Sequence, residues 1–78
     1  MSKALQRNFG RTVARLRREA GFSQEKFAVR VRVHRTYMSE IERGVSNISL
    51  DVIERLAKAL SISVGELFSQ GEQERHPK

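Results

Sequence analysis

Apolar residues recur along the chain at helical spacings, and the first such run lies near the N-terminus. Its members are three or four positions apart, so they share one face of a helix; they are Leu5, Phe9, Val13, Leu16 and Ala20. Gly21 follows the run, and we predict a helix over residues 5–20. A second stripe with nearly the same period is cationic. It is typical of a solvated face, with contact to DNA phosphate by one or two members as the alternative; it consists of Arg7, Arg11, Arg15 and Arg18.

Two short helical patterns follow, separated by a tight connection. The first covers residues 23–31, where the Ser23 hydroxyl can cap the helix and Glu25 suits the positive end of its dipole. The second covers residues 34–43 and ends at Gly44, a natural left-handed C-cap. Met38 and Ile41 form the apolar side of this second helix, because they are three positions apart.

The opposite side of the second helix carries groups that can bond DNA. At about 100° per residue, five polar side chains point away from Met38 and Ile41; they are Arg35, Thr36, Ser39, Glu40 and Arg43. Guanidinium, hydroxyl and carboxylate groups form hydrogen bonds with base edges or phosphates in the major groove. A short helix with an apolar underside, preceded by another short helix, has the layout of a helix-turn-helix motif.

The remaining apolar patterns are also helical. Ser49 can cap a helix that extends to residue 60, and its core-spaced residues are Leu50, Ile53, Leu56, Ala57 and Leu60. The other side of this helix predicts a solvated face made of Glu54, Arg55 and Lys58. Ser63 and Glu66 match a capping box, which predicts a short fifth helix. The sequence therefore predicts an all-α, five-helix domain over residues 1–69, with residues 70–78 as a disordered polar tail.

Composition and charge narrow the class of protein. The chain has 78 residues, of which 38% are apolar, and this suffices for one domain with a modest core. The net charge is +6, and residues 1–35 alone carry ten cations and two glutamates. A basic half on a small domain is typical of a nucleic-acid binder, although excess charge can also serve only solubility. The chain has no cysteine, no apolar run long enough to span a membrane and no signal-like N-terminus, so we expect a cytoplasmic setting.

The stretch from Ser23 to Gly44 and its flanks resemble the helix-turn-helix regulators of the XRE family, which includes lambdoid phage repressors and Cro. The resemblance covers residues 9–68 and is carried by Ser23-Gln24-Glu25, Ala28, Val33, Arg35-Thr36-Tyr37, Ile41-Glu42-Arg43-Gly44, Ser49-Leu50 and Leu56-Ala57-Ala59-Leu60. The Arg-Thr-Tyr and Ile-Glu-Arg-Gly segments also resemble the small controller proteins of restriction–modification systems. The resemblance implies a compact, lambda-repressor-like fold with its second and third helices as the helix-turn-helix.

The resemblance also implies roles for particular residues. It implies a partly buried ion pair between Arg17 and Glu42 that pins the first helix to the end of the third. We expect Arg35 and Thr36 to be the main base-reading residues, in a set that also holds Tyr37, Ser39 and Glu40. Contacts to the DNA backbone are expected from Ser23, Gln24, His34, Arg43, Ser46 and Asn47. For Gln24 the alternative is a surface amide, and for Ser46 and Asn47 it is ordinary turn chemistry.

The resemblance further implies a dimer contact through Ile62, Val64, Leu67 and Phe68, with plain core packing as the alternative for the last two.

Two positions depart from the family pattern. Arg32 stands where the turn usually has a glycine in a left-handed conformation, which costs another residue about 1 kcal/mol. We therefore expect either mild strain in the turn or a slightly different turn geometry. His34 stands where a hydroxyl residue usually caps the third helix, and a poor cap costs about 1 kcal/mol.

These observations favour a transcriptional regulator that binds specific double-stranded DNA as a homodimer on a palindromic operator. The operon that it controls could be that of a restriction–modification system. The alternative is an antitoxin-like or adaptor module whose main partner is another protein. An enzyme is disfavoured, because the chain has no histidine pair, glycine-rich phosphate loop or carboxylates at a catalytic spacing. We expect no cofactor, no metal and no small-molecule effector.

Overall fold

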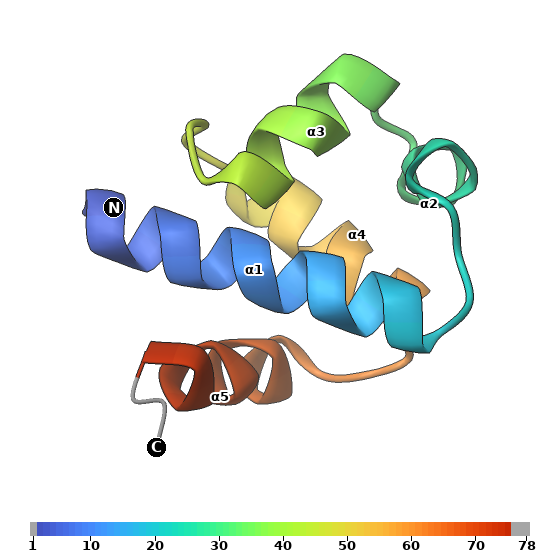
Figure 1. Cartoon of the computed structure of the whole chain (residues 1–78). Helices are drawn as coiled ribbons and strands as arrows, with labels where there is room; N and C mark the ends of the chain where they lie inside the picture. Colours follow the sequence, from blue (N-terminus) through green and yellow to red (C-terminus); the bar gives the residue numbers. More distant parts are fainter. Residues whose placement is uncertain (1, 76–78) are drawn as a thin grey trace.

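Helix α1 lies between two other helices and forms the centre of the structure (Figure 1). The computed structural model describes residues 2–75, and the side chains of residues 2–72. In this part of the chain there are five helices and no strands: α1 (Lys3–Glu19), α2 (Gln24–Val31), α3 (Arg35–Arg43), α4 (Leu50–Ala59) and α5 (Val64–Arg75). α3 packs on one side of α1 and α5 on the other, while α2 packs against both α3 and α4. The predicted all-α, five-helix architecture is confirmed.

Serine side chains begin four of the helices, as N-cap residues are expected to do. The hydroxyls of Ser23, Ser49 and Ser63 accept from the backbone N–H three positions later, at 3.1, 3.2 and 3.0 Å. Ser2 does the same for Leu5 at 3.1 Å, so α1 begins at Lys3 instead of Leu5. The helix boundaries therefore follow from local hydrogen bonding, which the sequence pattern placed to within a few residues.

The core is built from the apolar faces of all five helices. Its fully buried large side chains are Phe9, Val13, Phe27, Val31, Met38, Ile41, Leu56 and Leu67. Two residues that the spacing assigned to the core are exposed. Ala20 is exposed because α1 ends one residue earlier, and Leu50 is 80% exposed because it is the first residue of α4 and projects beyond the packed face. Val52 is buried in place of Leu50.

Helix α5 continues to Arg75, whereas a disordered tail was expected from residue 70. The added turns pack on α1. Gly71 is buried, and a Cβ atom there would lie 3.8 Å from Thr12 Oγ1. Gln70 Oε1 accepts from Arg15 Nη2 at 2.8 Å. Residues 76–78 of the expected tail lie outside the described residues.

Helix α1 approaches the end of α3 so closely that only glycine fits at the contact. A Cβ atom on Gly10 would collide with the carbonyl oxygen of Ile41 and would lie 2.7 Å from that of Glu42. Gly44, which ends α3 at φ +76°, lies against the backbone of Arg7. These two contacts fix the position of α3 relative to α1.

Replacing Gly10 with alanine should destabilise the protein by about 1–3 kcal/mol or more, because the methyl group meets backbone atoms that cannot move aside. Gly65→Ala is the matched control. Gly65 lies within α5 with only one side-chain atom nearby, at 3.8 Å, and alanine there should raise stability by up to about 1 kcal/mol. Denaturant unfolding measures both, and equal stabilities would contradict the close contact.

Candidate nucleic-acid interface

The polar side of α3 faces outward because the other side is anchored in the core. Met38 and Ile41 are fully buried. On the opposite side Arg35, Thr36 and Arg43 are exposed. The remaining predicted base-reading residues are half-buried; they are Tyr37, Ser39 and Glu40. The 100° rotation per residue that predicted an outward polar face therefore describes the structure well.

Five of the predicted DNA-contacting residues line one shallow hollow. It has a volume of about 230 Å³ and is lined by Gln24, Arg35, Thr36, Ser39 and Arg43. Gln24 reaches it because it is the first residue of α2, which packs beside α3. Since the hollow holds an amide, two hydroxyls and two guanidinium groups, it can donate hydrogen bonds to anionic oxygen or to base edges.

A hydrogen-bonded network below this surface joins α1, α2 and α3. Glu42 accepts from Arg17 Nε at 2.7 Å and from Arg17 Nη2 at 3.1 Å, which is a bidentate pair. The pair is nearly buried, with the two side chains 11% and 8% exposed. Arg17 Nη1 also donates to the Phe22 carbonyl at 2.8 Å. Gln24 Nε2 donates to Glu42 Oε1 at 3.1 Å. The Gln24 amide therefore forms a hydrogen bond within the protein, although it also lines the surface hollow.

The loop after α3 is fastened to α1 by a residue that the sequence patterns did not single out. Gln6 is buried, and its Nε2 donates to Asn47 Oδ1 at 2.6 Å and to the Ser46 carbonyl at 3.2 Å. The Ser46 hydroxyl in turn donates to Glu40 Oε1 at 3.2 Å. Gln6 lies next to Leu5 and three positions before Phe9, at the edge of the apolar stripe, and that position was the available signal. The loop is therefore shaped by protein contacts.

The turn between α2 and α3 keeps the left-handed geometry that glycine usually supplies. Arg32 has φ 66° and ψ 45°, and it ends α2 through its N–H to the Ala28 and Val29 carbonyls. The expected strain is therefore present, at about 1 kcal/mol. His34 does act as N-cap of α3, because its Nδ1 accepts from the Thr36 N–H, but the distance of 3.4 Å is long.

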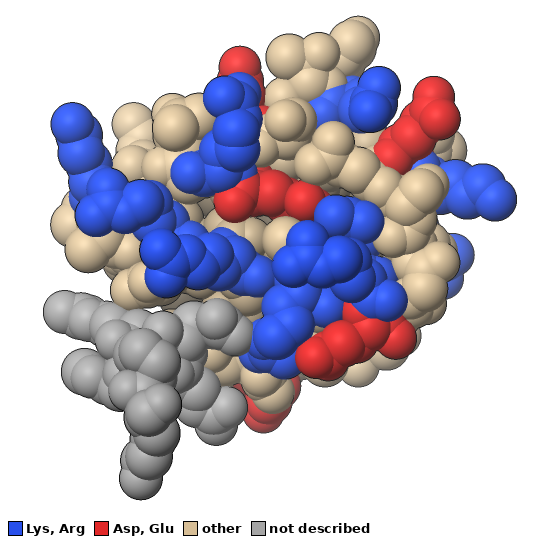
Figure 2. All heavy atoms as spheres, in the orientation of Figure 1, with Lys and Arg blue, Asp and Glu red and all other residues tan. Residues whose placement is uncertain are grey.

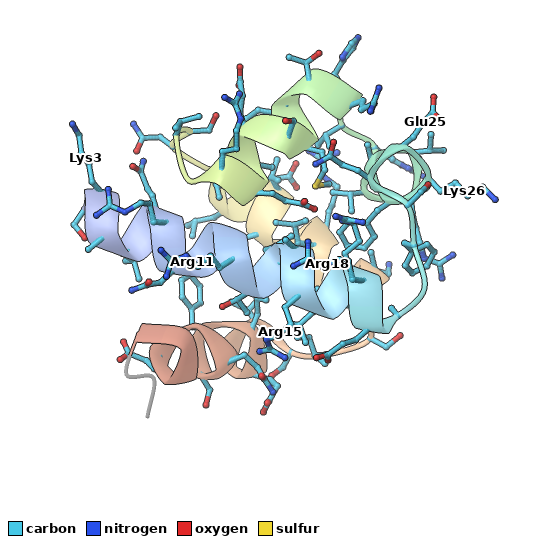
Figure 3. All side chains as sticks on the ribbon, in the orientation of Figure 1. Lys3, Arg11, Arg15, Arg18, Glu25 and Lys26 are labelled. Carbon is cyan, nitrogen blue, oxygen red and sulfur yellow. The ribbon has the colours of Figure 1, made fainter. Side chains whose placement is uncertain are left out.

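Cationic side chains spread over the face that carries α1 and continue toward α3 (Figure 2). Lys3, Arg7 and Arg43 line a second hollow of about 410 Å³ beside the C-terminal end of α3. Arg15 belongs elsewhere, because it pairs with Glu19 at 3.2 Å and lies toward α5 (Figure 3). Arg7 of the stripe thus lies next to α3, whereas Arg15 contacts α5.

The expected dimer residues are placed differently from one another. Leu67 is fully buried in the core of its own chain and offers no surface to a second copy. Ile62, Val64 and Phe68 are half-buried against the core, and the Phe68 ring lies 5.3 Å from that of Phe9. The expectation that Leu67 contributes to a dimer contact is therefore corrected, because Leu67 is a core residue. Ile62, Val64 and Phe68 remain candidates for that contact.

No helix among the described residues is long and apolar enough to cross a membrane. The same residues contain no group of three histidine, cysteine or acidic side chains placed to hold a metal ion.

Comparison with known proteins gives consistent matches. A family model described as a helix-turn-helix domain matches residues 8–68. The chain is 46% identical over 61 residues to the control protein C.BamHI of Bacillus amyloliquefaciens. The aligned region covers 77% of this chain and 75% of that protein. It is 43% identical over 67 residues to the control protein C.MunI of a Mycoplasma species, covering 85% and 90%. The solved restriction–modification controller protein C.AhdI from Aeromonas hydrophila is similar at 41% identity and a TM-score of 0.78, covering 81% of this chain and 96% of that one.

Replacing Glu42 with alanine should cost about 3 kcal/mol of stability, because it leaves the nearly buried Arg17 guanidinium without its carboxylate. Glu40→Ala is the matched control on the same helix. It removes a carboxylate that accepts one described hydrogen bond, from Ser46, and should cost about 1 kcal/mol or less. Thermal and denaturant unfolding compare the two, and an unchanged melt for Glu42→Ala would contradict the structural role of the pair.

Proposed function

We propose, since the chain belongs to the helix-turn-helix domain family, that it is a transcriptional regulator that binds specific double-stranded DNA as a homodimer. The observation that carries the proposal is the outward polar face of α3, where Arg35 and Thr36 are exposed over a buried apolar underside. A helix of this kind presents its N-terminal residues to base edges in the major groove. The role is regulatory and not catalytic, and it places the protein with the DNA in a bacterial cytoplasm.

Base recognition is assigned chiefly to Arg35 and Thr36. The Arg35 guanidinium can donate to O6 and N7 of one guanine, and Thr36 can offer its hydroxyl to a base or its methyl group to thymine. Tyr37, Ser39 and Glu40 complete the set at half-buried positions. Glu40 also accepts from Ser46, so its carboxylate is shared between the loop and any cytosine amino group that it meets.

Contacts with the phosphate backbone are assigned to residues around this face. Arg43 lies in the same hollow as Arg35 and supplies positive charge, and Gln24 borders it from the start of α2. Ser23, His34, Ser46 and Asn47 complete the proposed set: Ser23 and His34 are the N-caps of α2 and α3, and Ser46 and Asn47 lie in the loop after α3. Because such contacts release counterions, affinity for DNA should fall steeply as salt concentration rises.

Dimerisation is assigned to the half-buried apolar residues Ile62, Val64 and Phe68. Two-fold pairing sets two recognition helices about 34 Å apart, which suits a palindromic site. The control proteins C.BamHI and C.MunI and the restriction–modification controller C.AhdI support a role in controlling a restriction–modification operon. Selection of bound duplexes from a random pool would identify the operator and the spacing of its halves.

Arg35→Ala should weaken binding to the selected operator by about 1–3 kcal/mol and relax specificity at one base position. Arg43→Ala is the control. It should weaken binding to all sequences alike and lower the dependence of affinity on salt. Binding isotherms on the operator and on single-base variants measure both. Uniform weakening by Arg35→Ala would make Arg35 a phosphate contact, and failure of every duplex to bind, alongside a stable complex with another protein, would contradict the proposed function.

Val64→Glu should shift the protein toward monomer, because it places a charge in the proposed apolar contact. Val29→Glu makes the same change at a residue that is 74% exposed on α2, and it should leave the dimer intact. Sedimentation equilibrium distinguishes the two outcomes. A dimer that persists in Val64→Glu with unchanged stability would locate the contact elsewhere.

A further inference from the structure

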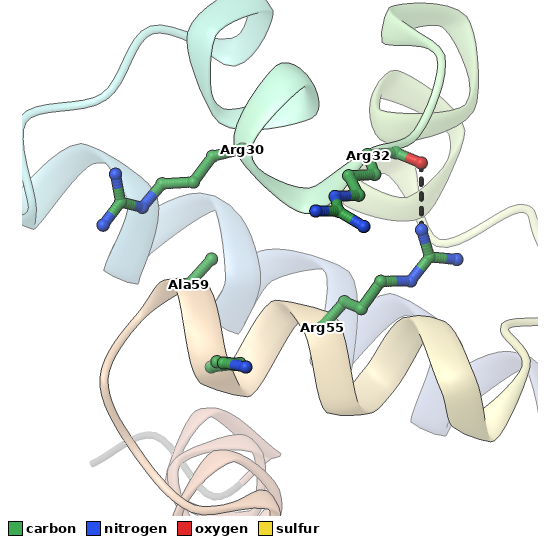
Figure 4. A pocket seen from close by; sticks show the side chains of 5 residues that line it. Arg30, Arg32, Arg55 and Ala59 are labelled. Carbon is green, nitrogen blue, oxygen red and sulfur yellow. Dashed lines mark hydrogen bonds between the residues drawn. The ribbon is translucent and has the colours of Figure 1, made fainter.

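Four cationic side chains line a hollow between α2 and α4, separate from the hollow that Arg35, Thr36 and Arg43 line. The hollow has a volume of about 430 Å³ and is lined by Arg30, Arg32, Arg55, Lys58 and Ala59. Figure 4 shows Arg32 and Arg55 close together at one end and Arg30 at the other. No carboxylate is among the lining residues, so positive charge accumulates in the hollow. The sequence had assigned Arg55 and Lys58 to an ordinary solvated face.

Most of this charge lacks an acidic partner. Within the described part of the chain, Arg30, Arg32 and Lys58 form no ion pair within 4.0 Å. Arg55 pairs with Asp51 at 3.1 Å, but the Asp51 side chain is 75% exposed and screened by water. Arg30 is oriented by the Phe22 ring, whose centroid lies 5.2 Å from its Cζ atom. An anion entering the hollow would therefore meet several unneutralised cations.

Arg55 holds the backbone that carries Arg32. Its Nη1 donates to the Val31 carbonyl at 3.1 Å and to the Arg32 carbonyl at 3.0 Å, which joins α4 to the end of α2. Its Nε is buried and has no hydrogen-bond partner among the described residues. Arg32 itself adopts a left-handed conformation that favours glycine. Residues that their surroundings hold in strained backbone conformations cluster at functional sites, and this one carries a guanidinium at the edge of the hollow.

We propose that this hollow binds a phosphate group, with Arg32 and Lys58 as its direct ligands and Arg55 as the residue that positions Arg32. Phosphate fits because guanidinium and ammonium groups form charge-assisted hydrogen bonds with its several oxygens. The phosphate is either part of a DNA backbone or carried by a small molecule.

The first experiment contains no DNA, so it does not depend on the proposed function. Sodium phosphate is titrated against sodium chloride at constant ionic strength, and the backbone amide signals of Arg32, Val33 and Lys58 are followed by NMR. Wild-type protein should show saturable shifts with phosphate. Arg32→Gly and Lys58→Gln should each weaken phosphate binding about tenfold, the loss expected for one charge-assisted hydrogen bond.

Two control variants match these changes. Ser61→Gly relaxes the other non-glycine residue with positive φ among residues 2–75, at 60°, without removing a charge. Lys26→Gln removes an exposed cation of α2 that does not line the hollow. Both should bind phosphate as the wild type does.

The second experiment identifies the source of the phosphate. If it belongs to DNA, Arg32→Gly should lower the slope of log affinity against log salt by about one unit, and Ser61→Gly should leave the slope unchanged. Weakened phosphate binding with an unchanged slope assigns the site to a small phosphorylated molecule. The proposal is overturned if Arg32→Gly and Lys58→Gln match their controls in the phosphate titration and Arg32→Gly matches Ser61→Gly in the slope.

Discussion

The nearly buried pair of Arg17 and Glu42 is the interaction on which the placement of the outward polar face of α3 depends. One carboxylate at the end of α3 accepts from α1 through Arg17 and from α2 through Gln24, so it orients three helices at once. Burying two charges is unfavourable unless their hydrogen bonds are well satisfied, and here the guanidinium also finds the Phe22 carbonyl. The close contact of Gly10 with the Ile41 and Glu42 carbonyl groups also joins α1 to the end of α3. Together they hold α3 against α1 while the polar side of α3 stays at the surface.

Much of the fold could be predicted because periodicity and caps agree. Serines precede the helical patterns at residues 23, 49 and 63, and each one does cap its helix. Periodicity fails at helix ends, where a residue with the right spacing extends beyond the packed face, as Leu50 does. It fails differently in α5. The polar composition after residue 69 predicted disorder, but Gly71 and Gln70 pack on α1, and that tertiary support is not visible in local sequence.

The candidate site could likewise be predicted only in part. Which side of α3 faces outward followed from geometry alone, whereas the partner of each polar group did not. Gln24 and Ser46 were assigned to DNA, and both also donate to glutamates of α3. Arg55 was assigned to solvent because a helical projection cannot show that the end of another helix lies over that side. The pairing of Arg17 with Glu42, which are 25 positions apart, came only from the family resemblance.

The contact between Gly44 and the backbone of Arg7 has a consequence for how DNA would be bound. It packs the N-terminal part of α1 against the C-terminal end of α3 with no space for a Cβ atom between them. The backbone positions that carry cations on these two segments therefore keep a fixed separation. When a surface on such a fixed backbone meets a duplex, part of the adjustment falls to the duplex, and base steps that bend cheaply are then favoured even where no side chain touches them. Mechanical softness of the operator would thus contribute to its selection.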